Sequence, residues 1–275
     1  MKKLFYIIFL FIFFQNVAIS DTICSNNFKC QNFEEMPNTI NTKIAKIFGI
    51  DFLQIKLTEF SIEKYIKYKY KNNINISVNA KSAKALKSGE FRKIIAKSKR
   101  IFIKNYSISD FRAETLCPYN KVVLNQKEYM FPHDIPVSFS AVVTNEDLDN
   151  IYNELINTFG INIGNICTIK WYIENSKLNI LVDISSLFIK TKFTISTELS
   201  IADNDIIFSN ISNTKTSIYL TKMLPQINSF NPISFMLKLA RNTNCYITIE
   251  NVKIIDDKIY VQGMFIIPKN CDITE

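Results

Sequence analysis

The stretch TNEDLDNIYNELINTF, from Thr144 to Phe159, is the most strongly patterned helix signal in this 275-residue chain. Thr144 is suited to cap the helix N-terminus, and Asp147 stands three residues later, where a capping box places its acid. The helix dipole also favours negative charge in the first turn. Apolar residues recur at spacings of three and four, so they share one wide stripe. They are Leu148, Ile151, Tyr152, Leu155, Ile156 and Phe159.

Outside this stretch, most of the chain after Ile74 alternates between apolar and polar residues, as β-strands do. In the segment 187–201 one face is apolar and the other almost wholly polar, which is typical of an antiparallel sheet with one solvated side. At about 3.4 Å per residue this strand would span roughly 50 Å. We therefore predict an α+β fold in which a long, strongly curved antiparallel sheet wraps around one or two helices.

The other elements follow from the same patterns. Helical spacing extends from Asn38 to Tyr70, as one broken helix or two shorter ones, and a second helical region covers 217–224 and 232–240. The tail KYIKYKYK could also be a strand. As a helix it would suit a membrane interface, although a solvated helix end is the simpler interpretation. Further strands are predicted at 74–83, 91–112, 136–143, 165–173, 178–184, 205–211, 246–255 and 259–267.

The N-terminus has the features of an export signal. Lys2 and Lys3 precede an apolar run at 4–14, and small residues end at Ser20, so cleavage is predicted before Asp21. The run is shorter than the roughly 20 apolar residues of a membrane span, although an uncleaved anchor stays open. We expect an exported protein of the periplasm or cell envelope, with a signal peptide at 1–20, an N-terminal segment at 21–37 and a single domain at 38–271.

All six cysteines follow the predicted cleavage site, and an even number in an exported chain favours disulfide bonds. A metal site is disfavoured because the chain has no CxxC pair and only one histidine, His133. Six cysteines allow 15 pairings. We rank first the pair that brackets a predicted hairpin, then the pair that closes a short loop, and then the remaining two: Cys245–Cys271, Cys24–Cys30 and Cys117–Cys167.

The formal net charge is +8, which suits an anionic membrane surface or a polyanionic envelope polymer as partner. A composition rich in Lys, Asn and Ile would also arise from AT-rich coding, without any such partner. The densest basic cluster lies in the predicted strands at 91–112. It is either a solvated strand face or a docking patch for lipid headgroups, and its members are Lys93, Lys97, Lys99, Arg100 and Lys104.

Catalytic motifs are not found. A serine hydrolase needs a nucleophile elbow and a histidine base, but no GxSxG occurs and His133 lies in a predicted loop. Paired acids such as Asp203 with Asp205 fall in predicted turns, where acids are common for conformational reasons. Two carboxylates facing each other across a cleft, as in a glycosidase, stay open. We expect a protein that is not an enzyme and that needs no cofactor or catalytic residue, and export disfavours nucleic acid as a partner.

The order of elements resembles that of the LmeA-like phospholipid-binding family, a group of exported bacterial envelope proteins similar to tubular lipid-binding proteins. The residues that carry the resemblance are Leu86-Lys87-Ser88-Gly89, Val143-Thr144-Asn145-Glu146-Asp147-Leu148 and Val261-Gln262-Gly263. It covers roughly residues 40 to 268. Asp149 stands where the family often has Asn, and the cysteine set is not a family hallmark.

The resemblance implies binding, and possibly transfer, of phospholipid or a related envelope lipid in an apolar groove between a curved sheet and helices. An acyl chain contributes about 0.8 kcal/mol per buried CH₂, although the same side chains could close on each other as core. A non-catalytic envelope scaffold or adhesion module is the alternative, and an envelope hydrolase is a third. The expected lipid-contacting residues are Leu148, Ile151, Tyr152, Leu155, Phe159, Leu220, Met223, Leu224, Phe235 and Met236.

Overall fold

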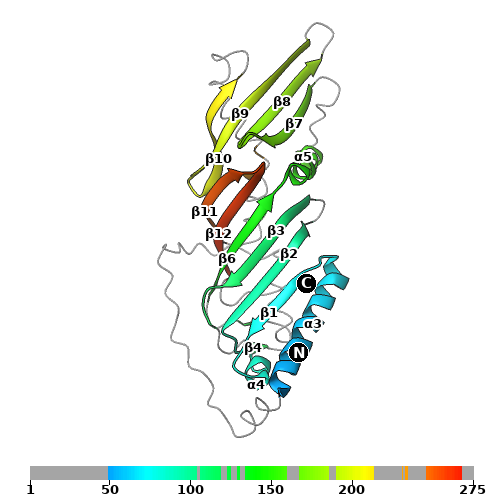
Figure 1. The fold of residues 1–275 in the computed structure, drawn as a ribbon, viewed down its shortest axis with the longest axis vertical. Coiled ribbons are helices and arrows are strands. Elements are labelled where there is room, and N and C mark those ends of the chain that lie inside the picture. The colour runs from blue at the N-terminus through cyan, green and yellow to red at the C-terminus, as the bar shows by residue number, and fades with distance from the viewer. Residues whose placement is uncertain are drawn as a thin grey trace.

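A computed structural model describes residues 49–103, 106–118, 123–124, 129–130, 134–159, 167–185, 190–213, 231, 233–234 and 246–267. These residues form antiparallel sheets accompanied by a few helices, which confirms the α+β class (Figure 1). The predicted export signal, the N-terminal segment and most of the second helical region lie outside the described residues.

The larger sheet has six strands in the order β1-β2-β3-β6-β12-β11, all antiparallel to their neighbours. Its hairpins are local, because β2 leads into β3 and β11 turns into β12 at Asp256-Asp257. The strands are β1 (Asn75–Asn79), β2 (Lys93–Ile103), β3 (Tyr106–Thr115), β6 (Ile135–Val143), β11 (Tyr246–Ile255) and β12 (Lys258–Ile267).

The smaller sheet has four strands in the order β10-β9-β8-β7. It is a meander whose two described turns, at Asn175-Ser176 and Asp203-Asn204, place non-glycine residues at positive φ, as tight hairpin turns require. The strands are β7 (Cys167–Glu174), β8 (Lys177–Ser185), β9 (Lys190–Ala202) and β10 (Asp205–Asn213). The short strands β4 (Val123–Leu124) and β5 (Tyr129–Met130) form a separate pair.

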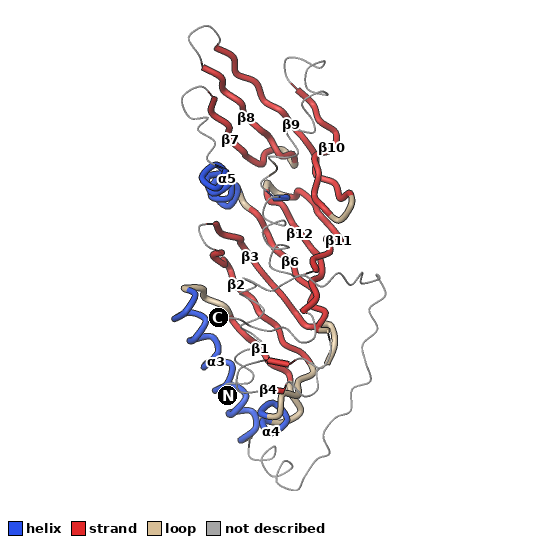
Figure 2. The backbone as a smooth tube through the Cα atoms, turned by 180° about the vertical axis from the view of Figure 1, so that it is seen from behind, coloured by secondary structure: helices blue, strands red, loops and turns tan. Residues whose placement is uncertain are grey.

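Three helices accompany the sheets in the part of the chain that the structure describes. Helix α3 (Ile50–Tyr70) and the short α4 (Ala83–Lys87) lie beside β1, at one end of an elongated arrangement (Figures 1 and 2). Helix α5 (Asn145–Phe159) directly follows β6 and contacts both β3 and β7. It therefore lies where the two sheets meet, as the view from behind also shows (Figure 2).

This arrangement differs from the prediction of one continuous sheet around a helix. Besides the short β4–β5 pair, the described strands form two open sheets, and α5 contacts one strand of each, β3 and β7. Each sheet ends at its own edge strands, which are β1 and β11 in the larger sheet and β10 and β7 in the smaller one, and the chain passes from β6 into α5 between the two sheets. Both sheets nevertheless contribute to one contiguous apolar core, which includes Val143, Leu148, Trp171 and Ile249.

Candidate functional site at the junction of the two sheets

The N-terminus of α5 is held by the predicted capping box. The backbone N–H of Thr144 donates to Asp147 Oδ2 at 3.0 Å, and the backbone N–H of Asp147 donates to Thr144 Oγ1 at 3.4 Å. The Thr144 hydroxyl also donates to Asp147 Oδ2 at 2.8 Å. Two N–H groups that a helix start would otherwise leave without partners are satisfied in this way.

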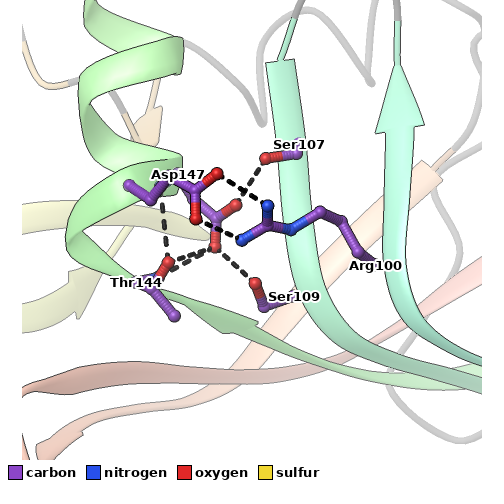
Figure 3. A network of polar contacts seen from close by, with 6 residues as sticks. Arg100, Ser107, Ser109, Thr144 and Asp147 are labelled. Carbon is purple, nitrogen blue, oxygen red and sulfur yellow. Dashed lines mark hydrogen bonds and ion pairs between the residues drawn. The ribbon is translucent and has the colours of Figure 1, made fainter.

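Asp147 does more than cap the helix. It is fully buried, and its carboxylate accepts hydrogen bonds from Ser107 Oγ at 2.5 Å and Ser109 Oγ at 2.8 Å, both on β3 (Figure 3). The small hydroxyl side chains let the strand approach the helix while solvating the charge. Asp147 therefore joins α5 to the six-stranded sheet.

An exposed ion pair lies beside this buried group. The guanidinium of Arg100, on β2, donates to both carboxylate oxygens of Glu146 at 2.7 Å (Figure 3). This bidentate geometry is the strongest form of an Arg–carboxylate pair. The hydrogen bonds from Arg100 lower the pKa of Glu146, and the bond to Glu146 raises the pKa of Arg100.

Asn145 joins α5 to the other sheet. Its side-chain amide accepts from the backbone N–H of Ile173 at 2.6 Å and donates to the Ile173 carbonyl at 3.3 Å. The side chain thereby replaces a neighbouring strand at the edge of β7. Successive residues at the start of α5 thus bind different sheets.

An aromatic cluster lies where α5 packs against the apolar face of the four-stranded sheet. The Trp171 ring on β7 is 6.3 Å from the Tyr152 ring on α5 and 5.6 Å from the Phe208 ring on β10, measured between centroids. Trp171 is 3% exposed and Tyr152 is half-buried. The cross-strand neighbours Ile180 and Ile195 extend the same apolar face.

The indole N–H of Trp171 is buried and has no hydrogen-bond partner. A buried donor left unsatisfied costs about 1–3 kcal/mol, and buried indoles usually find an acceptor. The cluster therefore combines an apolar surface with one unpaired donor, which are complementary to an apolar ligand that carries an acceptor oxygen.

The start of 232–240, the second part of the second predicted helical region, packs on this same sheet. The carbonyl oxygen of the Asn231 side chain accepts from the backbone N–H groups of Ile233 and Ser234, and its amide donates to the carbonyl of Ile206 on β10. Ile233 is fully buried. The predicted contact residues Leu220, Met223, Leu224, Phe235 and Met236 lie outside the described residues.

The contact residues predicted on α5 have different environments. Leu148 and Ile151 are fully buried and belong to the core, whereas Tyr152 is half-buried at the aromatic cluster. The side chains of Leu155 and Phe159 are not described, although the helix backbone there is. Among the residues of the predicted stripe whose side chains are described, Tyr152 is thus the one that lies beside the indole N–H of Trp171.

Two members of the predicted basic cluster on β2 form ion pairs with acids. Lys93 pairs with Glu114 at 2.9 Å and Arg100 pairs with Glu146, so two of its members are neutralised by acids. Lys97 and Lys99 are exposed, and Lys104 lies outside the described residues. Hydrogen bonds from Arg112, and then from Lys93, lower the pKa of Glu114.

Cys117 is a buried half-cystine just beyond the end of β3. Cys167 begins β7, but its side chain is not among those described. The predicted Cys117–Cys167 pair therefore stays a prediction. The other four cysteines, Cys24, Cys30, Cys245 and Cys271, lie outside the described residues.

The described part of the chain contains no group of three or more His, Cys, Asp or Glu side chains placed to hold a metal ion. None of its helices combines the length and the apolar character needed to cross a membrane.

Comparison with known proteins identifies no relative: no protein-family model, no curated protein and no solved structure matches this chain. The class that the fold defines is therefore an α+β protein of two antiparallel sheets. The sequence patterns predicted Tyr152 of the candidate site but not Trp171. Trp171 could have been noticed because it is the only tryptophan in the chain and stands on an alternating strand.

Proposed function

We propose that this protein binds a phospholipid or a related envelope lipid without chemical conversion. The site is the junction of α5 with the apolar face of the four-stranded sheet. The observation that carries the proposal is the unpaired Trp171 indole N–H inside an apolar, aromatic environment. An ester carbonyl would accept from that N–H, while the acyl chain would lie along Tyr152 and the neighbouring apolar side chains.

The proposal agrees with the resemblance to exported phospholipid-binding proteins. The sheet that was expected to wrap a helix would correspond to the region where α5 meets the four-stranded sheet, which is the proposed lipid site. The residues Leu155, Phe159, Leu220, Met223, Leu224, Phe235 and Met236 belong to the proposed lining on sequence grounds. An anionic headgroup would remain near the surface, where the net positive charge of the chain favours it.

The single tryptophan provides a direct test. Phospholipids brominated on their acyl chains quench tryptophan fluorescence at contact, so titration of the chain from Asp21 onward should quench Trp171 and saturate near one lipid per protein. Mass spectrometry of lipids extracted from the purified protein should identify the natural ligand. Absence of both co-purifying lipid and quenching would refute the proposal.

A matched pair of variants tests the proposed hydrogen bond. Trp171→Phe keeps an apolar ring but removes the donor, and it should weaken lipid binding, measured by native mass spectrometry, by about tenfold, the value of one hydrogen bond. Tyr172→Phe removes a hydroxyl from the adjacent residue, on the opposite face of β7, and should leave binding unchanged. Equal effects of the two substitutions would count against the site.

The scaffold or adhesion alternative is favoured by a different observation, namely that Leu148 and Ile151 are closed into the core. It predicts an interior that excludes lipid and an exposed apolar face for a partner. The quenching experiment separates the two functions, because a closed interior leaves Trp171 insensitive to brominated lipid.

A further inference from the structure

All acidic side chains of helix α3 lie on the side that faces the protein, where they accept hydrogen bonds from the backbone. Glu63 and Glu59 accept from the backbone N–H groups of Ile76 and Val78 on β1, at 2.7 and 2.8 Å. Asp51 accepts from the backbone N–H of Ala83 at 2.9 Å. Because β1 is the edge strand of the six-stranded sheet, its outward N–H groups need such partners.

The opposite side of α3 carries an exposed apolar stripe. Its four members follow spacings of three, four and three residues, which places them on one helix face. Exposed fractions are 46% for Ile50, 60% for Leu53, 54% for Leu57 and 53% for Phe60. A contiguous apolar surface that stays open to solvent marks an interaction site more often than a chance exposure.

Lysines complete this outer face. Lys64 and Lys67 continue the spacing of the stripe toward the helix C-terminus, and Lys56 flanks it. All three are exposed, and the Lys64 ammonium lies 4.7 Å from the centroid of the Phe60 ring. Lys56 pairs with Glu59, whereas the acids of α3 bind β1 and α4 on the inner side. Lys64 and Lys67 are therefore the lysines that add positive charge to the apolar outer face.

We propose that the outer face of α3 docks the protein on an anionic membrane surface, with the helix lying in the plane of the interface. Apolar side chains would enter the boundary between headgroups and acyl chains, while the lysines, whose long stems reach upward, would pair with phosphates. This docking surface is separate from the lipid site at α5, and the proposal does not depend on that site.

Other occupants of the stripe are disfavoured by charge. A second copy of α3 would bring the lysines of two identical faces together. The segment 38–48 of this chain carries Lys43 and Lys46 and no acid, so it would also add like charge. An anionic lipid surface, in contrast, is complementary to both features of the face.

The test is co-sedimentation of the chain from Asp21 onward, which lacks only the predicted export signal and therefore its apolar run. Vesicles are either pure phosphatidylcholine or phosphatidylcholine with one-third phosphatidylglycerol. We expect strong binding to the anionic vesicles, weak binding to the neutral ones, and a decrease as salt screens the charges.

Two double variants separate the apolar and charged contributions. Leu53→Ser with Leu57→Ser should weaken partitioning by about tenfold or more, and Lys64→Gln with Lys67→Gln should do the same through lost attraction to anionic lipid. Ile255→Ser is the matched control, because Ile255 is 48% exposed in the distant β11–β12 hairpin and should not contribute. Circular dichroism verifies that each variant is folded.

Three outcomes would overturn the proposal. They are no binding to anionic vesicles, equal loss in the Ile255→Ser control, and a wild-type dimer that the Leu53/Leu57 variant converts to monomer without changing vesicle binding. Failure here is distinguishable from failure of the lipid site, because quenching of Trp171 by monomeric brominated lipid does not require α3.

Discussion

At the scale of single residues, asparagine and aspartate side chains take over hydrogen bonds that strands and helices cannot make for themselves. Asn72 pairs with both the N–H and the carbonyl of Phe102, at 2.7 and 2.9 Å. Asn145 does the same at Ile173, and Asp147 binds Ser107 and Ser109. These asparagine and aspartate side chains are short, so the backbone segments that each of them connects lie close together.

Among these residues, Asp147 is the one whose substitution should lower the free energy of unfolding the most. Asp147→Ala would leave the buried hydroxyls of Ser107 and Ser109 and the N–H of Thr144 without their acceptor. We expect the free energy of unfolding, measured by urea denaturation, to fall by about 3 kcal/mol or more. Asp149→Ala, an exposed position in the same helix, should change it by less than about 0.5 kcal/mol; comparable losses in both variants would contradict the assigned role.

The exposed pair of Arg100 with Glu146 predicts a pH dependence. Because hydrogen bonds from Arg100 lower the pKa of Glu146 in the folded protein, the pair stabilises the fold above the ordinary glutamate pKa of about 4.3. That contribution is lost as the pH falls through the lowered folded value. An NMR titration of the Glu146 carboxyl should show this low inflection, and Arg100→Gln should raise it. Lys99→Gln should not, and an unchanged inflection in Arg100→Gln would disprove the cause.

At the scale of elements, the six-stranded sheet requires a glycine where β12 packs most closely. A Cβ built on Gly263 would lie 2.2 Å from the carbonyl oxygen of Thr248 and 3.0 Å from the Phe139 ring. The pairing of β11 with β12 is also irregular next to this contact, with a register shift between Ile249 and Asn251. The sequence Val261-Gln262-Gly263, noted above as part of a resemblance, therefore has a local steric cause.

Gly263→Ala should accordingly be more harmful than an ordinary alanine substitution in a strand. Backbone must move to accept the methyl group, so we expect a loss of about 1–3 kcal/mol in thermal or urea unfolding, as for overpacked cores. Gly49→Ala is a useful comparison, since its Cβ would meet nothing within 4 Å although its φ of +69° carries about 1 kcal/mol of strain. A Gly263→Ala protein as stable as wild type would show that the sheet yields there.

At the scale of the whole molecule, two asparagines connect the sheets at different places. Asn145 binds Ile173 beside α5. Asn204, in the β9–β10 turn, donates to the Ile247 carbonyl at 2.6 Å and accepts from the Ile249 N–H at 2.7 Å on β11. Together with the shared core, these contacts make the two sheets one structural unit.

Asn204→Ala should loosen this connection without unfolding either sheet. The N–H of Ile249 loses its acceptor, so its hydrogen exchange should accelerate, and the free energy of unfolding should fall by about 1–3 kcal/mol. Asn251→Ala removes only an exposed contact with Gln262 on the same hairpin and serves as the control. Exchange at Ile249 that is unaffected by Asn204→Ala would exclude the proposed connection.

Local features were predictable because their causes lie within a few residues. The capping box of Thr144 and Asp147, the β7–β8 and β11–β12 hairpins and the alternation along β9 all depend on neighbouring side chains and turns. The α+β class follows from their sum. The candidate site was predictable only through Tyr152, because the apolar stripe indicates which face of α5 is buried but not what covers it.

The sequence by itself thus determined the long strands, their apolar faces and the start of α5, but not the short helix α4. Tertiary structure alone decided that the strands divide into two sheets, that the acids of α3 turn inward, and that the Trp171 donor is buried without a partner. Each of these depends on contacts between residues far apart in the chain, such as Asn204 with Ile249. No local pattern encodes such contacts, because the partner is chosen by packing and by the need to satisfy buried hydrogen-bonding groups.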